Sequence, residues 1–501
     1  MKRIQPLILF TVFACLLLAC KKNDPPAEVT VLGPDLVVFG LSANNELIQF
    51  NAKAPQVFIS KKAITNIGAS EKLLSIDYRP ATGELYALSN ASKLYIINTT
   101  TVAARVVNAT AFTPAITGSV ASIDFNPTVD RLRLVTNSGQ NLRLNPETGA
   151  VVATDGAING VSNASISGIA YTNSKAGAAT TVLYDVDATT TKLYKQDPPN
   201  NGALAEIGSL GVSFAGQVAF DISGDNTAAL IAAQNGTANT LYLLNITTGA
   251  ATKIGTLPEV VLDIAIPTEM VAYAVDNSNN LLLFNPENPM PVSKTITGLQ
   301  TGEAVLGIDF RPLNGQLYAL GSSNRLYTLN LASGAATAVG TAAFTTALSG
   351  TDFGFDFNPT VDRIRVVSNT GQNLRLNPID GTVAAVDAVL NPGTPVVSAA
   401  AYTNNFAGTT TTALLVIDAA TDQVYLQNPP NNGVLTSLGS LGVDISGANG
   451  FDIGSMSNKA YLVATVAGTT KIFSVNITTG ATAAVSNMPV SVKAFAVGTG
   501  F

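Results

Sequence analysis

Histidine and tryptophan are both absent from this 501-residue sequence. Without histidine the chain has no imidazole general base, no histidine-containing catalytic triad and no histidine metal ligand. Without tryptophan it lacks the largest aromatic platform for stacking sugars or bases, although 13 Tyr and 20 Phe remain. Both cysteines, Cys15 and Cys20, lie at the N-terminus, so the rest of the chain has no disulfide and no cysteine metal site.

Charged residues are also scarce, at 12% of the chain, and 27 Lys and Arg against 33 Asp and Glu give a net charge of −6. A nucleic-acid-binding surface needs a basic excess, so the composition excludes nucleic acid as the expected partner. Hydrophobic residues make up 47%, which argues against intrinsic disorder. A chain of this length exceeds one ordinary core and predicts two or more domains, or a repeat array.

The N-terminus has the pattern of an export signal. Lys2 and Arg3 precede a largely apolar run over 7–19, which is short for a membrane span of about 20 residues. The run ends in Leu17-Leu18-Ala19-Cys20, which resembles the lipobox of bacterial lipoproteins.

This resemblance implies a lipoprotein signal peptide over 1–19 that is cleaved before Cys20, lipidation of Cys20, and a polar tether over 20–27. The membrane is then a partner through the lipid anchor. Lys21 follows the cysteine where an Asp would favour the inner membrane, so the outer membrane is expected. The alternative is an ordinary secretory signal that contains a chance cysteine.

The mature chain is internally repeated. DFNPTVDR occurs at 124–131 and 356–363, GQNLRLNP at 139–146 and 371–378, and PPNNG at 198–202 and 429–433. Several long matches in nearly one register indicate two homologous copies, over 28–260 and 261–501.

Each copy is itself periodic. Four short segments of β type, separated by Asn, Gly and Ser turns, recur about five times in each copy, or about 46 residues per unit. This predicts an all-β fold, a β-propeller of four-stranded blades, with a β-helix or stacked sandwiches as alternatives.

How the ring closes is left open by the sequence. Segments 28–32, 261–266 and 492–497 align as innermost strands, so three candidates serve two copies. Two five-bladed units are favoured, although the linker 267–269 spans at most about 14 Å and would bring the rings into contact. One ten-bladed ring is the alternative.

The units carry motifs that resemble a known family. GIDFRP at 307–312, GQLYAL at 315–320 and the two repeated octapeptides are similar to the bacterial domain-of-unknown-function 4394 family, over both copies. The resemblance implies an exported, repeat-built β domain. No established activity or catalytic residue comes with it.

An aspartate recurs in the first strand of many units. The set comprises Asp77, Asp124, Asp221, Asp263, Asp309, Asp356 and Asp452. A residue needed in most blades serves each blade, so we expect these carboxylates to accept hydrogen bonds from backbone amides in the adjoining turn. The alternatives are a ring of ligands around the channel and a pair of catalytic carboxyls.

Arginines form the densest charged cluster, with Arg131, Arg133 and Arg143 in one copy and Arg363, Arg365 and Arg375 in the other. One interpretation is a fork that binds carboxylate or phosphate. The other is an ion pair between blades, with Asp130 or Asp362 as the partner.

Two further patterns have structural interpretations. The run Asp276-Asn277-Ser278-Asn279-Asn280 offers oxygen ligands to calcium, the one cofactor that the sequence suggests, but a turn explains it as well. The paired PPNNG segments predict stiff connections that could shape a binding face.

These observations favour a lipid-anchored, non-enzymatic propeller that binds an envelope protein or a glycan. The alternative is a polysaccharide hydrolase or lyase that uses carboxylates on a propeller face. An enzyme site should break the repeat, and Asp352 and Asp444 are acids without acidic counterparts in the first copy.

The lipobox generates the first prediction. Replacing the acylated thiol by a hydroxyl, Cys20→Ser, should abolish fatty-acid labelling and release the protein from membranes. Metabolic labelling followed by membrane fractionation measures both effects. Labelling that persists in the variant would refute the lipoprotein interpretation.

Overall fold

The computed structural model describes residues 31–446 and 448–501, and in this part of the chain all regular elements are β-strands except two 3₁₀ turns. The predicted signal peptide, Cys20 and most of the 28–32 segment lie outside the described residues. Within the described part, no helix is long and apolar enough to cross a membrane.

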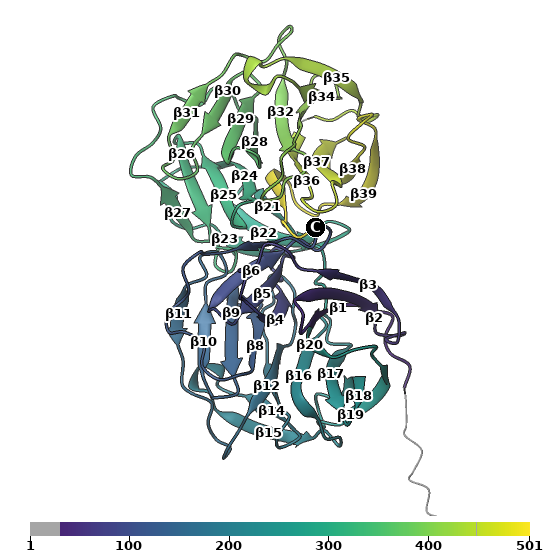
Figure 1. Cartoon of the computed structure of the whole chain (residues 1–501). Helices are drawn as coiled ribbons and strands as arrows, with labels where there is room; N and C mark the ends of the chain where they lie inside the picture. Colours follow the sequence, from purple (N-terminus) through teal and green to yellow (C-terminus); the bar gives the residue numbers. More distant parts are fainter. Residues whose placement is uncertain (1–30, 447) are drawn as a thin grey trace, which may run out of the picture.

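Ten four-stranded antiparallel sheets follow one another along the chain, and each is one propeller blade. The two halves of the chain form two separate rings, one above the other in Figure 1. Their inner strands contact one another in closed cyclic order, β20, β4, β8, β12 and β16 in one ring and β40, β24, β28, β32 and β36 in the other. The prediction of two five-bladed propellers is therefore confirmed.

The first propeller contains blades 1 to 5. Its strands, blade by blade, are β20 (Val261–Ala265), β1 (Val37–Ser42), β2 (Glu46–Asn51) and β3 (Phe58–Ala63); β4 (Leu73–Tyr78), β5 (Leu85–Ser89), β6 (Lys93–Ile97) and β7 (Ala104–Val106); β8 (Ala121–Asn126), β9 (Arg131–Thr136), β10 (Asn141–Leu144) and β11 (Val151–Thr154); β12 (Ile166–Tyr171), β13 (Leu183–Asp187), β14 (Lys192–Gln196) and β15 (Leu204–Ser209); β16 (Ala215–Ile222), β17 (Ala229–Asn235), β18 (Ala238–Leu244) and β19 (Ala251–Thr256).

The second propeller contains blades 6 to 10. Its strands, blade by blade, are β40 (Val492–Val497), β21 (Ala272–Asp276), β22 (Asn280–Asn285) and β23 (Asn288–Thr295); β24 (Val305–Arg311), β25 (Gln316–Gly321), β26 (Arg325–Leu329) and β27 (Ala336–Val339); β28 (Phe353–Asn358), β29 (Arg363–Ser368), β30 (Asn373–Leu376) and β31 (Val383–Val386); β32 (Val397–Tyr402), β33 (Leu414–Asp418), β34 (Gln423–Gln427) and β35 (Leu435–Ser440); β36 (Ala448–Ile453), β37 (Ala460–Val466), β38 (Thr469–Val475) and β39 (Thr482–Asn487).

Each ring is closed by a strand from the far end of its own copy. β20 pairs with β1 in blade 1, and β40 pairs with β21 in blade 6. Of the three candidate inner strands, the segment at 28–32 is the redundant one. Because β20 completes the first propeller, the domain boundary predicted between residues 260 and 261 lies one strand too early.

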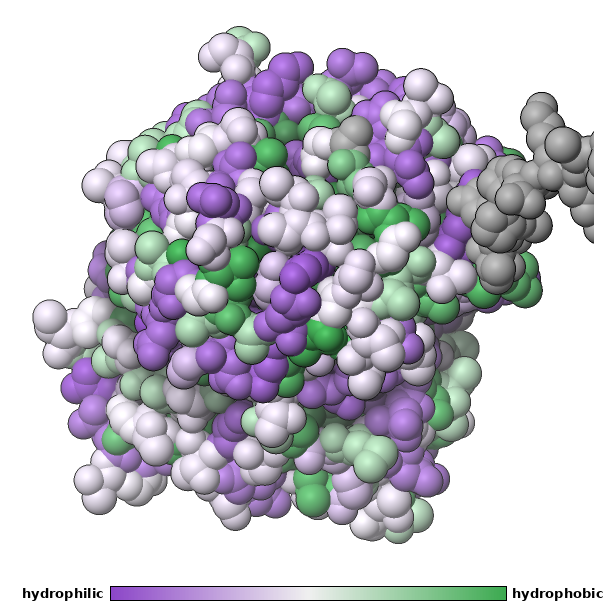
Figure 2. Space-filling model, turned by 90° about the horizontal axis from the view of Figure 1, so that it is seen from below, coloured by the Kyte–Doolittle hydropathy of each residue, from purple (hydrophilic) through white to green (hydrophobic). Residues whose placement is uncertain are grey.

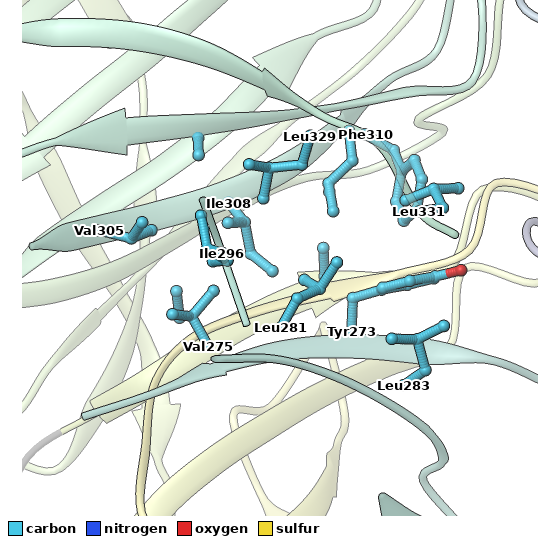
Figure 3. Packing of buried hydrophobic residues seen from close by; sticks show 14 of the residues in the cluster. Tyr273, Val275, Leu281, Leu283, Ile296, Val305, Ile308, Phe310, Leu329 and Leu331 are labelled. Carbon is cyan, nitrogen blue, oxygen red and sulfur yellow. The ribbon is translucent and has the colours of Figure 1, made fainter. Parts of the chain in front are cut away.

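The burial pattern explains why these sequences form blades. Inner and middle strands such as β5 are buried on both faces by the adjacent blades, whereas the outer strand β11 alternates between half-buried and exposed residues. Between blades 6 and 7, hydrophobic side chains of β21 and β22 pack against those of β24, and Figure 3 labels Tyr273, Val275, Leu281, Leu283, Ile308 and Phe310 among them.

The surface away from this packing is mixed. Figure 2, which views the molecule from below, shows hydrophilic and hydrophobic residues intermingled over the side of the first propeller that points away from the second.

The two propellers touch, as the short linker predicts. The Tyr273 hydroxyl of the second donates to the Ala81 carbonyl of the first at 2.8 Å, and the Gly500 amide donates to the Thr82 carbonyl at 2.8 Å. Gly83 has φ 75° in this contact, and a Cβ there would lie 2.3 Å from the Phe501 ring, so a side chain is excluded. The C-terminus thus lies between the rings, as Figure 1 shows.

Ring closure generates the second prediction. A fragment of residues 28–266 retains β20 and should be a soluble monomer that unfolds cooperatively. A fragment of residues 28–258 lacks that strand and should aggregate or dimerise, because it leaves the edge of β1 and a gap in the ring open. Sedimentation velocity and urea denaturation distinguish them, and identical behaviour of the two fragments would contradict the role given to β20.

Candidate functional site

The repeated aspartates converge on the central channel of each propeller. One carboxylate oxygen from each of Asp77, Asp124 and Asp221 lies within 4.8 Å of the other two, and Asp309, Asp356 and Asp452 are arranged in the same way. All six side chains are buried.

Each of these carboxylates accepts a hydrogen bond from the inner strand of the next blade. Asp77 accepts from the Phe125 amide at 2.7 Å, and Asp309 accepts from the Phe357 amide at 2.7 Å. Asp124, Asp356, Asp221 and Asp452 accept from the amides of Tyr171, Tyr402, Ile266 and Val497, respectively. An inner strand has an unpaired edge toward the channel, so an acceptor from the neighbouring blade satisfies its amides.

The aspartates thus accept hydrogen bonds from backbone amides, as expected, but the amides belong to a different element from the one predicted. The prediction named the adjoining turn, whereas the amides belong to the inner strand of the next blade. The carboxylates also do not lie on a propeller face, because they are buried in the channel. This placement argues against the hydrolase or lyase that was the alternative for these residues.

Asp263 differs from the other channel aspartates. It aligns with Ser75 and with Ala494 of the second copy, two residues before the repeated position. It accepts from the Ser75 hydroxyl and from the Ile76 amide at 3.0 Å. In the second propeller, small residues occupy the positions along the channel that correspond to Asp263 and its neighbours. A Cβ on Gly354 would lie 2.6 Å from that of Ala400. The two channels therefore differ in the side chains that lie two residues before the repeated aspartates.

Burial raises the pKa of every channel aspartate. It raises the pKa of Asp221 to about 8 and the pKa of Asp263 to about 7, and it raises the pKa of Asp452 to about 7. The pKa values of Asp77 and Asp309 are raised well above their usual range, first by burial and then by the charges of Asp221 and Asp452, respectively. Burial thus favours the protonated form of these carboxyls.

Three carboxylates at this spacing are also the oxygen donor set that calcium prefers. Asp77, Asp124 and Asp221, and the matching triad of the second propeller, are the residues that could hold such an ion. The other calcium candidate is a turn, because Asp276 accepts from the amides of Ser278 and Asn280 at 2.8 Å.

The arginine cluster divides into two kinds of residue. Arg133 and Arg365 are buried, whereas Arg131 and Arg363 each donate to the carbonyl of the preceding residue at 2.8 Å. The ion pairs between blades exist with other arginines. Arg79 binds Asp130 at 2.9 Å and Arg311 binds Asp362 at 2.8 Å, so the expected pairing of the cluster itself with these aspartates is wrong.

Buried Arg133 and Arg365 have partners that the sequence interpretation missed. Arg365 donates to Asn373, Asp387 and Asn431 at 2.6, 2.6 and 2.7 Å, and Arg133 makes the equivalent bonds in the first copy. Asn431 belongs to the second PPNNG segment, whose 3₁₀ turn η2 (Pro430–Asn432) presents it. Both copies contain an Asp-Arg-(Leu/Ile)-Arg segment, at 130–133 and 362–365, and a PPNNG segment, and this joint recurrence was the signal that could have found the contact.

A cleft of about 470 Å³ lies between the two propellers. The first propeller contributes the turn and strands of blade 2 between residues 83 and 106. The second contributes the turn 312–313, the loop 405–408, Met456 and the C-terminal residues 499–500. We call this the interpropeller cleft, and it falls within the size range of small-molecule sites.

The walls of the interpropeller cleft are mainly apolar, and its charges are paired. Leu85, Ile96, Leu313, Phe406 and Met456 are among the lining residues. Glu84 binds Arg105 at 2.7 Å, and Arg105 also donates to the Leu313 carbonyl at 2.7 Å across the propeller boundary. Asn405 and Thr499 line the cleft and are buried, and one side-chain oxygen of each has no hydrogen-bond partner in the described protein.

The family assignment rests on the sequence of both propellers. A family described as "Domain of unknown function (DUF4394)" matches residues 46–265 and 280–497. The chain belongs to this family. The two matched regions fall within the two rings, which confirms the two tandem copies. The first region begins after β1 and the second after β21, so each ring extends one strand beyond its matched region. The resemblance implied a repeat-built β domain, and the structure shows that each copy is one five-bladed propeller.

Other comparisons are less informative. A search of the curated proteins found no match. Among solved structures, the extracellular domain of a one-component system from B. thetaiotaomicron is 12% identical, with a TM-score of 0.25, 90% of this chain and 58% of that chain covered. Dihydro-heme d1 dehydrogenase NirN is 10% identical, with a TM-score of 0.25, 80% of this chain and 72% of that chain covered. Neither likeness bears on function.

The two DUF4394 domains meet in an approximately two-fold manner that creates two clefts. The interpropeller cleft uses Pro312 and Leu313 with Thr99, and a second cleft uses the equivalent Pro80 and Ala81 with Leu331. The second has only about 10 Å³ of free space. Leu331 is fully buried there, so one cleft is filled and the other is open.

The channel aspartates generate the third prediction. Their folded-state pKa values exceed the value of about 3.9 for an unfolded chain, so between about pH 4 and 8 the folded protein retains protons that the unfolded chain has released. Stability is therefore greatest at the acidic end and falls as the pH rises toward 8. Urea denaturation at pH 5, 6, 7 and 8 measures this, and the absence of histidine removes the usual titrating group in that range.

A matched variant tests the assignment to the channel. Asp263→Ala gives the first propeller the residue that the second has at Ala494, and it should make the loss of stability with pH smaller. A surface change, Asp444→Asn, should leave the pH dependence as it is. Stability that rises between pH 5 and 8, or a slope that Asp263→Ala does not alter, would contradict the interpretation.

Proposed function

We propose that this protein is a non-enzymatic binding protein of the cell envelope that takes an uncharged, largely apolar small molecule into the interpropeller cleft. A lipid on Cys20 anchors it to the outer membrane. The observation that carries the proposal is that the open cleft is built from positions at which the two copies differ.

Four side chains that line the cleft differ between the two copies. Phe406 stands where the first copy has Lys175, and Met456 stands where it has Asp225. Arg105 and Glu84 have Thr337 and Gln316 as counterparts. Residues that serve only the propeller fold recur in both copies, as the repeated channel aspartates do. Residues found in one copy alone therefore indicate a feature that the protein has only once, such as a ligand site.

The chemistry of the walls identifies the class of ligand. Glu84 and Arg105 neutralise each other, which leaves no net charge to attract an ion. Phe406, Met456 and Leu313 offer apolar contact to such a ligand. Burying an uncharged molecule against such walls is favourable by about 25 cal/mol per Å² of apolar surface.

Catalysis on polysaccharide is not supported by this geometry. Of the described residues that line the cleft, Glu84 is the one carboxylate, and it is bound to Arg105 and Thr82. Glycosidases of the usual kind need a pair of carboxyls facing the scissile bond. The cleft therefore favours binding.

The fourth prediction tests the cleft with N-phenyl-1-naphthylamine, a neutral apolar fluorophore. The mature chain with Cys20→Ser should bind it saturably, with one high-affinity equivalent. Phe406→Lys and Met456→Asp introduce the charges of the first copy and should each weaken binding at least tenfold, because a charge in an apolar cleft must be desolvated. Fluorescence titration measures the affinity.

Ile379→Lys is the matched control, since it places a charge on an exposed hydrophobic residue outside the cleft. It should leave binding unchanged. A thermal-shift screen of neutral compounds extends the test, because a specific ligand raises stability by mass action. Probe binding that survives both cleft variants at full affinity would overturn the proposal.

A further inference from the structure

A second cavity lies within the second propeller, between blades 8 and 9. It has a volume of about 210 Å³ and is lined by Arg363, Arg365, Arg375, Tyr402 and Asn431, with Asn358, Val361 and Pro430. We call it the arginine pocket. It shares no lining residue with the interpropeller cleft, and the function proposed above does not use it.

The positive charge in the arginine pocket exceeds the negative charge. Arg365 and Arg375 share one carboxylate, that of Asp387, at 2.6 and 2.8 Å. The nearby carboxylate of Asp362 is bound to Arg311 of blade 7 instead. Three guanidinium groups therefore face one carboxylate, which leaves about two positive charges without a protein counterion.

The free donors of the pocket belong chiefly to Arg363. Its Nη1 donates to the carbonyl of Asp362, and its other N–H groups donate to no residue that the structure describes. Arg365 is only 2% exposed, and its bonds to Asp387, Asn373 and Asn431 hold it in place beside the cavity. A fixed guanidinium next to an unsatisfied one is an arrangement that binds oxyanions through parallel N–H···O bonds.

The first propeller repeats the arginines but adds an acid. Arg131, Arg133 and Arg143 occupy the equivalent positions, and Asp185 stands on β13 where the second propeller has Val416. Asp185 is fully buried, and neither of its oxygens has a hydrogen-bond partner in the described protein. Burial raises its pKa, and the nearby charge of Arg133 acts in the opposite direction. The first copy thus has a carboxyl beside its buried arginine, and the second copy has none there.

We propose that the arginine pocket binds a phosphate group, either as the free dianion or as a small phosphate ester. Two unbalanced positive charges match the two negative charges of phosphate, whereas a single carboxylate would balance one. The volume accommodates the group with a short substituent. We expect the equivalent site of the first propeller to bind it more weakly, because Asp185 places a carboxyl group beside Arg133 where the second propeller has the apolar Val416.

The test is isothermal titration calorimetry of the mature chain with Cys20→Ser, using sodium phosphate, glycerol 3-phosphate and sodium acetate. Phosphate or its ester should bind with one equivalent, more weakly as salt increases, and at least tenfold more tightly than acetate. Binding of the ester alone identifies an ester as the ligand, and binding of both identifies the free group.

Matched variants locate the site. Arg363→Gln should weaken phosphate binding at least tenfold, and Arg131→Gln, its counterpart in the first propeller, should leave it unchanged. Val416→Asp, which introduces the acid of the first copy, should also weaken it, with circular dichroism confirming that each variant is folded. No binding of phosphate or ester, acetate binding of equal affinity, or equal effects of Arg363→Gln and Arg131→Gln would overturn the proposal.

Discussion

The pairing of a late strand with an early one holds each propeller together. β20 with β1, and β40 with β21, convert a row of blades into a ring, and every other contact between blades depends on that closure. A row has two exposed edges, whereas a closed ring has none between its blades. Closure also brings five inner strands around one axis, which creates the channel in which the aspartates meet.

The channel then explains why aspartate recurs. The inner strand is the last strand of each sheet, so the amides on its channel-facing edge need acceptors. The crowded axis leaves room only for short side chains. Asp77 and Asp309 meet both demands by accepting from their own strand and from the next. This arrangement buries several carboxyls close together, which disfavours their charged forms and raises their pKa values. One constraint thus accounts for the most conspicuous repeated residue.

Much of the fold could be predicted from the sequence, because turns and strands recur in each unit and repeats expose their own boundaries. The choice between 28–32 and 261–266 as the closing strand could not be predicted. Apolar and polar residues alternate in the same way in both segments, and pairing between distant parts of the chain decides which one closes the ring. The partners of Asp77 and of Arg365 lie on adjacent blades, which the local pattern does not reveal. The interpropeller cleft depends on how two rings sit together, so Phe406 and Met456 stood out only once that placement was known.

The position of β40 has a consequence for biosynthesis. The closing strand of the first propeller, β20, precedes every strand of the second propeller in the chain. The first ring can therefore close while the second propeller is still being made. The second propeller lacks the innermost strand of blade 6 until β40 has been made, after all its other strands. The Phe501 carbonyl, which follows β40, accepts from the Met456 amide at 2.7 Å. A chain that ends before β40 would contain one finished ring and one that cannot close.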